Sequence, residues 1–127
     1  MSIQQVSKVN EMLEYLKFSF HKNQKNNIKI LFQLFDKDIN IIQQNISIII
    51  NKDRIEINDR IDLDYNTEIK IQYNSFIKLY SGNMSAWGLC KMLLYGKDVK
   101  TKNFSIKLFR KFVGNFDFNK WNDFYKR

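Results

Sequence analysis

The stretch that decides the fold reads EIKIQY at residues 68–73, SFIKLYSG at 75–82, GKDVK at 96–100 and FSIKLFRKFV at 104–113. Apolar and polar residues alternate in the first piece, which predicts a strand with one buried face. The second and fourth pieces carry apolar residues at helical spacing, and Gly82 is a natural helix stop. Ser85 and Gly96 bracket a further short helix. This part of the chain therefore predicts a strand followed by helices.

Upstream of it, apolar residues recur at steps of three and four from Val6 to Phe20. This spacing predicts an amphipathic helix near residues 3–20, and Ser2 with Gln5 forms a capping box at its start. The polar run at 21–27 predicts a loop.

From Ile28 to Leu34 the apolar period becomes two, which predicts a strand. Residues 36–38 form a predicted turn, a second strand is expected to start near Ile39, and alternation continues over 46–51. Residues 51–53 predict a hairpin turn before the alternating Ile55 and Ile57. The result is an antiparallel meander with one face under helices and one facing water.

The 127 residues suffice for one domain with its own core. We expect an α+β fold: a largely antiparallel, twisted sheet of about five strands with helices covering one face. The single domain spans 1–127, with an N-terminal helix at 1–20, the sheet at 28–73, helices and a further strand at 74–115, and an aromatic tail at 116–127. The tail is too apolar to hang free in water. It is expected to pack on the domain, and the alternatives are a lid over the ligand opening, a cover over a sheet edge or a contact with a partner.

The pieces between Glu68 and Val113 resemble, in their order, sterol carrier protein 2-like (SCP2) lipid-binding domains. In that family a strand leads into a helix ending in a Ser-Gly-like step, here Ser81-Gly82, and a Gly-Lys strand, here starting at Gly96, precedes the closing helix. The family's Gly-Asp turn is replaced by Thr101-Lys102-Asn103, and Asn103 can supply the left-handed conformation. The resemblance covers the last two thirds of the chain. It implies an apolar tunnel between sheet and helices, bordered by the loop and the closing helix.

The formal charge of +8 favours an anionic partner: a membrane surface, an acidic protein or ligand, or nucleic acid. The alternative is that a composition rich in Ile, Asn and Lys and free of Pro reflects an AT-rich genome, with many lysines only solvated. One cysteine, Cys90, fits a reducing compartment. The N-terminus lacks signal-peptide character, and the C-terminus is not a peroxisomal address, so we expect a cytoplasmic protein.

Several kinds of chemistry lack the residues they need. His21 and Cys90 are far apart in sequence, so no metal site and no cofactor are expected. Residues 36–47 begin like a calcium loop, but Ile41 and Ser47 replace the required glycine and glutamate. Asp62 and Asp64 have no base or electrophile placed beside them, so we expect no enzyme.

The segment Met84–Tyr95 mixes Trp, Met and branched aliphatic residues, a composition that suits a cavity for varied apolar ligands or, alternatively, an ordinary core. On the strength of the resemblance, the expected cavity residues are Phe76, Leu79, Tyr80, Met84, Trp87, Leu89, Met92, Leu93, Leu108, Phe109 and Phe112. A head group or an anionic membrane is expected to meet Lys91, Lys97, Lys100, Lys107, Arg110 and Lys111. The alternative for these basic residues is that they only keep the outer face soluble.

The expected function is non-catalytic binding of a lipid, sterol or isoprenoid-like ligand, for transport or for presentation to an enzyme. The resemblance also implies a close variant, an accessory or scaffold role in quinone or lipid metabolism. A small basic nucleic-acid-binding module is a rival, although the basic residues are scattered and no nucleic-acid-binding motif is present. An interaction domain with a filled core is a third alternative. The sequence leaves the ligand, the oligomeric state and the partner proteins open.

Overall fold

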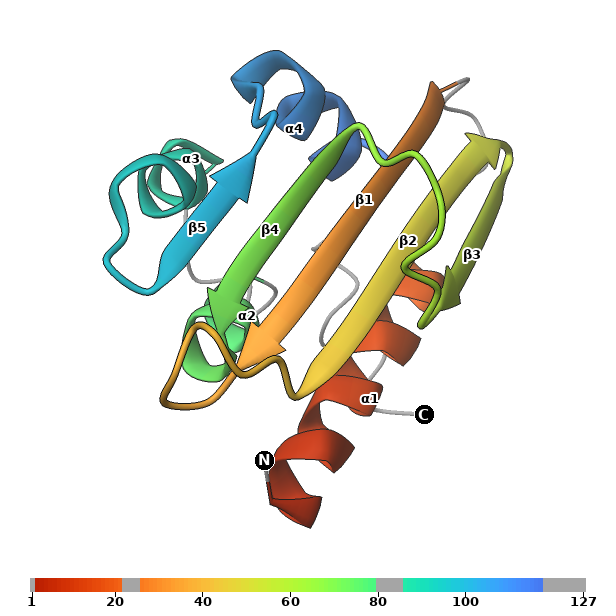
Figure 1. Cartoon of the computed structure of the whole chain (residues 1–127). Coiled ribbons are helices and arrows are strands. Elements are labelled where there is room, and N and C mark those ends of the chain that lie inside the picture. The colour runs from red at the N-terminus through yellow and green to blue at the C-terminus, as the bar shows by residue number, and fades with distance from the viewer. Residues whose placement is uncertain (1, 22–25, 80–85, 118–127) are drawn as a thin grey trace.

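The computed structural model describes residues 2–21, 26–79 and 86–117 (Figure 1). The helices and strands in chain order are α1 (Ile3–Ser19), β1 (Asn26–Phe35), β2 (Gln44–Lys52), β3 (Arg54–Asn58), β4 (Thr67–Gln72), α2 (Tyr73–Leu79), α3 (Ala86–Tyr95), β5 (Val99–Lys102) and α4 (Ile106–Val113).

The five strands form one sheet in the order β3-β2-β1-β4-β5. β1 runs parallel to β4, and the other three pairings are antiparallel. Phe32 at the centre of β1 is level with Ile46 on one side and Ile69 on the other. The expected α+β class and the largely antiparallel sheet are therefore confirmed, with one parallel pair at the centre.

The helices cover one face of this sheet: Figure 1 shows α1, α2 and α4 behind the strands and α3 beside the edge strand β5. The alternate residues of β1 that the sequence assigns to the buried face, Ile28 to Leu34, are all at most 2% exposed. Val9, Met12 and Leu16 of α1 belong to the same core. The predicted capping box is present, because the Ser2 side chain accepts from the Gln5 backbone and the Gln5 side chain accepts from the Ser2 backbone.

The other face of the sheet is only partly open to water. β3 is an edge strand and β4 lies beyond β1, so the connection at 59–66 crosses this face over β2 and β1 (Figure 1). The Tyr65 hydroxyl donates to the Arg60 carbonyl and lies 2.9 Å from the Ser47 hydroxyl, and the Lys29 backbone N–H donates to Asn66 Oδ1 at 2.8 Å. Ser47 is consequently buried, as is Leu31 on the same face. The expectation of a wholly solvated second face is wrong there.

Two element boundaries differ from the sequence prediction. No strand begins near Ile39: Asp38 accepts the Asn40 N–H at 2.9 Å through its side chain and the Ile41 N–H at 2.9 Å through its carbonyl, which favours a turn. Strand β2 begins only at Gln44. At the end of β4, Tyr73 opens α2 instead of closing the strand.

The segment around β5 confirms the expected turn residues and shifts the strand. Residues 96–98 form a turn and β5 begins at Val99. Asn103, directly after the strand, has φ 58°, the left-handed conformation that the sequence assigned to it. Ser105 then caps α4 by accepting the Leu108 N–H at 3.2 Å, so the closing helix starts two residues after Phe104.

Candidate apolar ligand site

Five phenylalanines form an aromatic cluster between the sheet and the helices: Phe32, Phe76, Phe109, Phe112 and Phe116. The Phe32 ring meets Phe76 edge to face at 5.4 Å between centroids and lies 6.4 Å from Phe112. Phe112 in turn lies 6.0 Å from Phe109 and 5.2 Å from Phe116. These separations are those of attractive aromatic pairs. The aromatic cluster therefore joins β1, α2, α4 and Phe116, which lies three residues after the end of α4.

The strong amphipathicity of α4 explains how it delivers two of these rings. Phe109 and Phe112 are three residues apart, so they share one helix face, and both are buried. Lys107, Arg110 and Lys111 occupy the other positions and are exposed. Because Arg110 and Lys111 lie in the last helical turn, their charges also interact favourably with the helix dipole.

The structure brings together the described members of the predicted cavity set. Phe76, Leu79, Leu93, Phe109 and Phe112 are buried in one continuous core. Met92 and Leu108 are half-buried and pack against that core. Tyr80 and Met84 lie outside the described residues, as do the side chains of Trp87 and Leu89 on α3.

The sequence analysis did not include the sheet residues that face this set. Phe32, Ile69 and Ile71 are buried in the same cluster, and Val99 of β5 packs against it half-buried. The period-two alternation of β1 and β4 already assigned the first three to the core face, so that pattern was the available signal. A ligand entering from the helix side would meet these strands as its floor.

The described side chains fill the centre of the site and leave its margin looser. Phe32 and Phe76 are 0% exposed and Phe112 is 1% exposed. Partial exposure begins at the α3 and α4 margin, at Met92, Leu108 and Val113.

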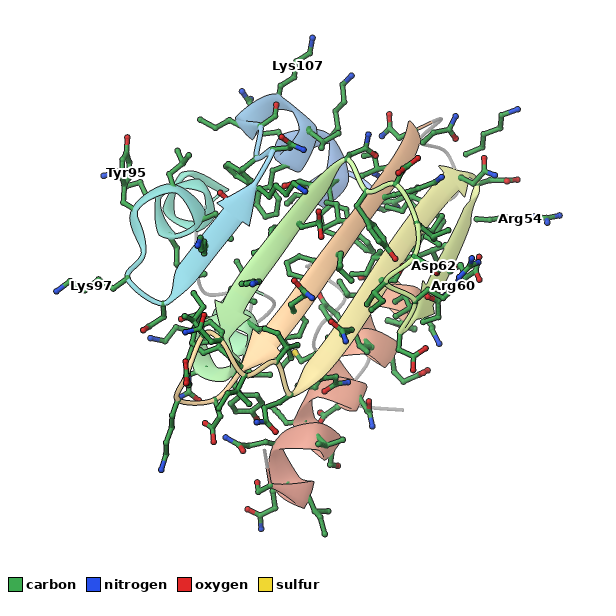
Figure 2. The ribbon with its side chains drawn as sticks, in the orientation of Figure 1. Arg54, Arg60, Asp62, Tyr95, Lys97 and Lys107 are labelled. Carbon is green, nitrogen blue, oxygen red and sulfur yellow. The ribbon has the colours of Figure 1, made fainter. Side chains whose placement is uncertain are left out.

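The predicted head-group residues do not form one cluster. All six are exposed, but Lys97 and Lys107 lie at opposite ends of β5 and point outward (Figure 2). Lys100 lies on the other face of the sheet, because Val99 takes the core side and Lys100 is level with Lys70 of β4. The sheet thus separates Lys100 from α4, which leaves Lys107, Arg110 and Lys111 as the basic group beside the aromatic cluster.

The titratable groups near the core and loop 59–66 do not form an acid–base pair. Burial raises the pKa of Tyr73, and burial together with the Asp117 carboxylate raises the pKa of Tyr15 to about 12, so both phenols are neutral at physiological pH. Arg60 Nε donates a hydrogen bond to Asp62 Oδ1 at 3.1 Å, and this bond lowers the pKa of Asp62. Asp62 is therefore ionised and held by Arg60, which suits a loop contact better than proton transfer.

Among residues 2–21, 26–79 and 86–117, no three His, Cys, Asp or Glu side chains gather where they could hold a metal ion. Within the same ranges, no helix combines the length and apolar character needed to cross a bilayer.

No protein-family model matches the sequence, and no curated protein matches it. Solved structures do. The ubiquinone synthesis protein UbiJ-SCP2 superimposes with a TM-score of 0.59 at 8% identity, over 89% of this chain and 95% of that one. Sterol carrier protein-2 like-3 from Aedes aegypti gives a TM-score of 0.57 at 11% identity, over 96% of this chain and 99% of that one.

A third similar structure is the sec-alkylsulfatase Pisa1 from Pseudomonas sp., with a TM-score of 0.60 at 11% identity. The match covers 80% of this chain but spans only 15% of the sulfatase. At such identities structural likeness shows the fold alone. The chain has the SCP2-like fold, as the order of its sequence elements implied.

Proposed function

We propose that the protein binds a lipid, sterol or isoprenoid-like molecule between the sheet and the helices α3 and α4, without catalysing a reaction on it. The observation that carries the proposal is the aromatic cluster with its half-buried margin at Met92 and Leu108, set in an SCP2-like fold. The likeness to a structure named sterol carrier protein-2 like-3 supports a sterol or other lipid as the ligand class. Transport of the ligand or its presentation to an enzyme is the role that such binding would serve.

Burial of hydrocarbon supplies enough free energy for this role. Each buried methylene contributes about 0.8 kcal/mol, so a twelve-carbon chain offers on the order of 10 kcal/mol before the costs of ordering and association. Met92 is suited to the margin because its unbranched side chain adapts to different shapes. The site would open by displacing half-buried side chains at the α3 and α4 margin, while the fully buried rings stay packed.

The basic group on α4 gives the ligand a preferred orientation. Lys107, Arg110 and Lys111 are exposed on the helix that carries Phe109 and Phe112 on its other side. An anionic head group, or the anionic surface of a membrane from which the ligand is drawn, would be attracted to this helix.

An accessory role in quinone metabolism is the second candidate. Its support is the likeness to a structure named as a ubiquinone synthesis protein, over nearly the full length of both chains. In that role the bound molecule would be an isoprenoid quinone precursor, held for an enzyme rather than carried between membranes. The two candidates share the same apolar site and differ in the ligand found there.

Native mass spectrometry of freshly purified protein, followed by organic extraction and lipid analysis, tests the proposal. A discrete apolar adduct is expected in the wild type, and its chemical class separates the two candidates. Met92→Asp should abolish the adduct, because Met92 packs against the core, whereas Leu94→Asp on the same helix should keep it, because Leu94 is 41% exposed. Circular dichroism checks that both variants fold. An adduct retained equally by both variants would place the ligand elsewhere, and a wild type that takes up no lipid would refute the function.

A further inference from the structure

The face of the sheet opposite the helices carries two lysines that oppose each other. Lys70 on β4 and Lys100 on β5 are partners in the antiparallel register, so their side chains project side by side from adjacent strands. In the next pair of this face, Lys102 Nζ lies 3.6 Å from Glu68 Oε2. Neither Lys70 nor Lys100 forms an ion pair with an acidic side chain in the part of the chain that the structure describes. Like charges directly opposite each other destabilise a sheet, so this arrangement has a cost that a bound anion would remove.

The two lysines border a cleft. Its volume is about 440 Å³, and it is lined by Gln33, Glu68, Lys70, Lys100, Thr101 and Lys102. Gln33 on β1 is half-buried and its amide is oriented, because Nε2 donates to Asn45 Oδ1 at 3.1 Å. Figure 1 shows β1, β4 and β5 side by side on this face, away from α3 and α4. The sheet thus separates the cleft from the apolar site, so a ligand in the cleft would bind independently of the proposed function.

We propose that this cleft binds a small phosphate-bearing molecule. Three lysines stand against one glutamate in its lining, so its field favours an anion. Lysine ammonium groups act as mobile point charges that bind phosphate groups, and three of them line this cleft. The volume falls in the range of small-molecule sites and exceeds that of a phosphate group, which leaves room for the rest of the ligand.

The lining also distinguishes a small molecule from larger anionic partners. Among the residues that the structure describes, its lining includes no aromatic side chain on which a nucleic-acid base could stack. The described lining likewise includes no large apolar side chain that would insert into a bilayer. A positively charged cleft whose described lining offers no aromatic or apolar side chain for stacking or insertion fits a soluble phosphate monoester.

The test is calorimetric titration with inorganic phosphate and with glycerol 3-phosphate at constant ionic strength. The variant Lys70→Gln/Lys100→Gln should weaken binding by about tenfold or more, because each lysine provides a charge-assisted contact. The matched control is Lys52→Gln/Arg54→Gln, which removes the same charge from exposed positions at the β2–β3 hairpin, on the edge of the sheet opposite β5. It should change the affinity by less than about twofold, because β3 lies three strands from β4, about 14 Å at the usual strand spacing, which exceeds a Debye length. Lys70→Arg/Lys100→Arg should keep most of the affinity.

Backbone amide shifts in heteronuclear NMR locate the ligand and verify that each variant folds. Shifts confined to β4, β5 and Gln33 of β1 support the proposal. An equal loss in the cleft variant and the β2–β3 hairpin variant would overturn it, because the binding would then depend only on net charge. A wild type that ignores both phosphates but binds vesicles containing phosphatidic acid would overturn it too, because the anion source would be a membrane surface.

Discussion

Raising the pH from 10 to 12 should remove about 2 kcal/mol of stability through Tyr15 alone. Tyr15 on α1 is 0% exposed, and burial, helped by the Asp117 carboxylate, raises its pKa from 10.0 to about 12. Above pH 10 the unfolded chain releases this proton while the folded chain keeps it. The unfolded state therefore binds fewer protons, and the free energy of unfolding falls as pH rises. The contribution is fully present below pH 10 and is lost as the pH passes the folded pKa of about 12.

Urea unfolding followed by circular dichroism at pH 9, 10, 11 and 12 measures this effect. Lysines and other tyrosines titrate in the same range, so the informative quantity is the difference between the wild type and Tyr15→Phe. That difference should shift by about 2 kcal/mol against the wild type from pH 10 to 12, because the slope approaches about 1.4 kcal/mol per pH unit only between the two pKa values. Tyr95→Phe is the matched control, because Tyr95 is 80% exposed, and its curve should run parallel to that of the wild type. Parallel curves for Tyr15→Phe as well would refute the assignment of the alkaline loss to this phenol.

Three further predictions concern packing and charge. Gly96→Ala should lower the free energy of unfolding by about 1–3 kcal/mol in thermal melts, because the new Cβ would lie 2.4 Å from the Met92 carbonyl oxygen of α3. Gly114→Ala is the control and should change the free energy of unfolding far less, because the nearest atom to its new Cβ is 3.4 Å away. Phe32→Ala should cost about 3–5 kcal/mol in urea unfolding, since its ring is 0% exposed; a loss below about 1 kcal/mol would contradict the packed centre. Lys70→Glu should raise the free energy of unfolding by about 0.2–1 kcal/mol, because the new carboxylate would face Lys100 on the adjacent strand. The increase should vanish when Lys100 is also replaced by Gln, and an increase that persists there would show that the pair is not its cause.

The sequence predicted those parts of the fold that are set by local pattern. The capping box at Ser2, the alternation through Phe32 and the positive φ at Asn103 each depend on a few neighbouring residues, and each is confirmed. A period of two necessarily places alternate residues on opposite faces, so the core side of β1 followed directly. The order of elements from Glu68 onward was sufficient to indicate the fold.

One local turn and several features set by distant contacts were missed. The apolar residues after Asp38 suggested a strand, but Asp38 accepts local hydrogen bonds there and holds the chain in a turn. The parallel pairing of β1 with β4, and the crossing of loop 59–66 that buries Ser47, depend on residues far apart in sequence. The position of Lys100 is different: alternation with Val99 was enough to place it away from α4, and that signal was overlooked.

The two faces of the sheet present opposite chemistry to a ligand. On the helix side the buried rings around Phe32 and Phe112 form an apolar core beside a basic helix. On the other side Lys70 and Lys100 border a cleft whose charged residues are three lysines and one glutamate among the residues that the structure describes. A phospholipid cannot use both at once, because the hydrogen-bonded strands β1, β4 and β5 lie between them without a gap. Saturating the apolar site with a neutral isoprenoid should therefore leave phosphate affinity unchanged, and a shift of phosphate affinity on lipid binding would show that opening of α3 and α4 moves β5.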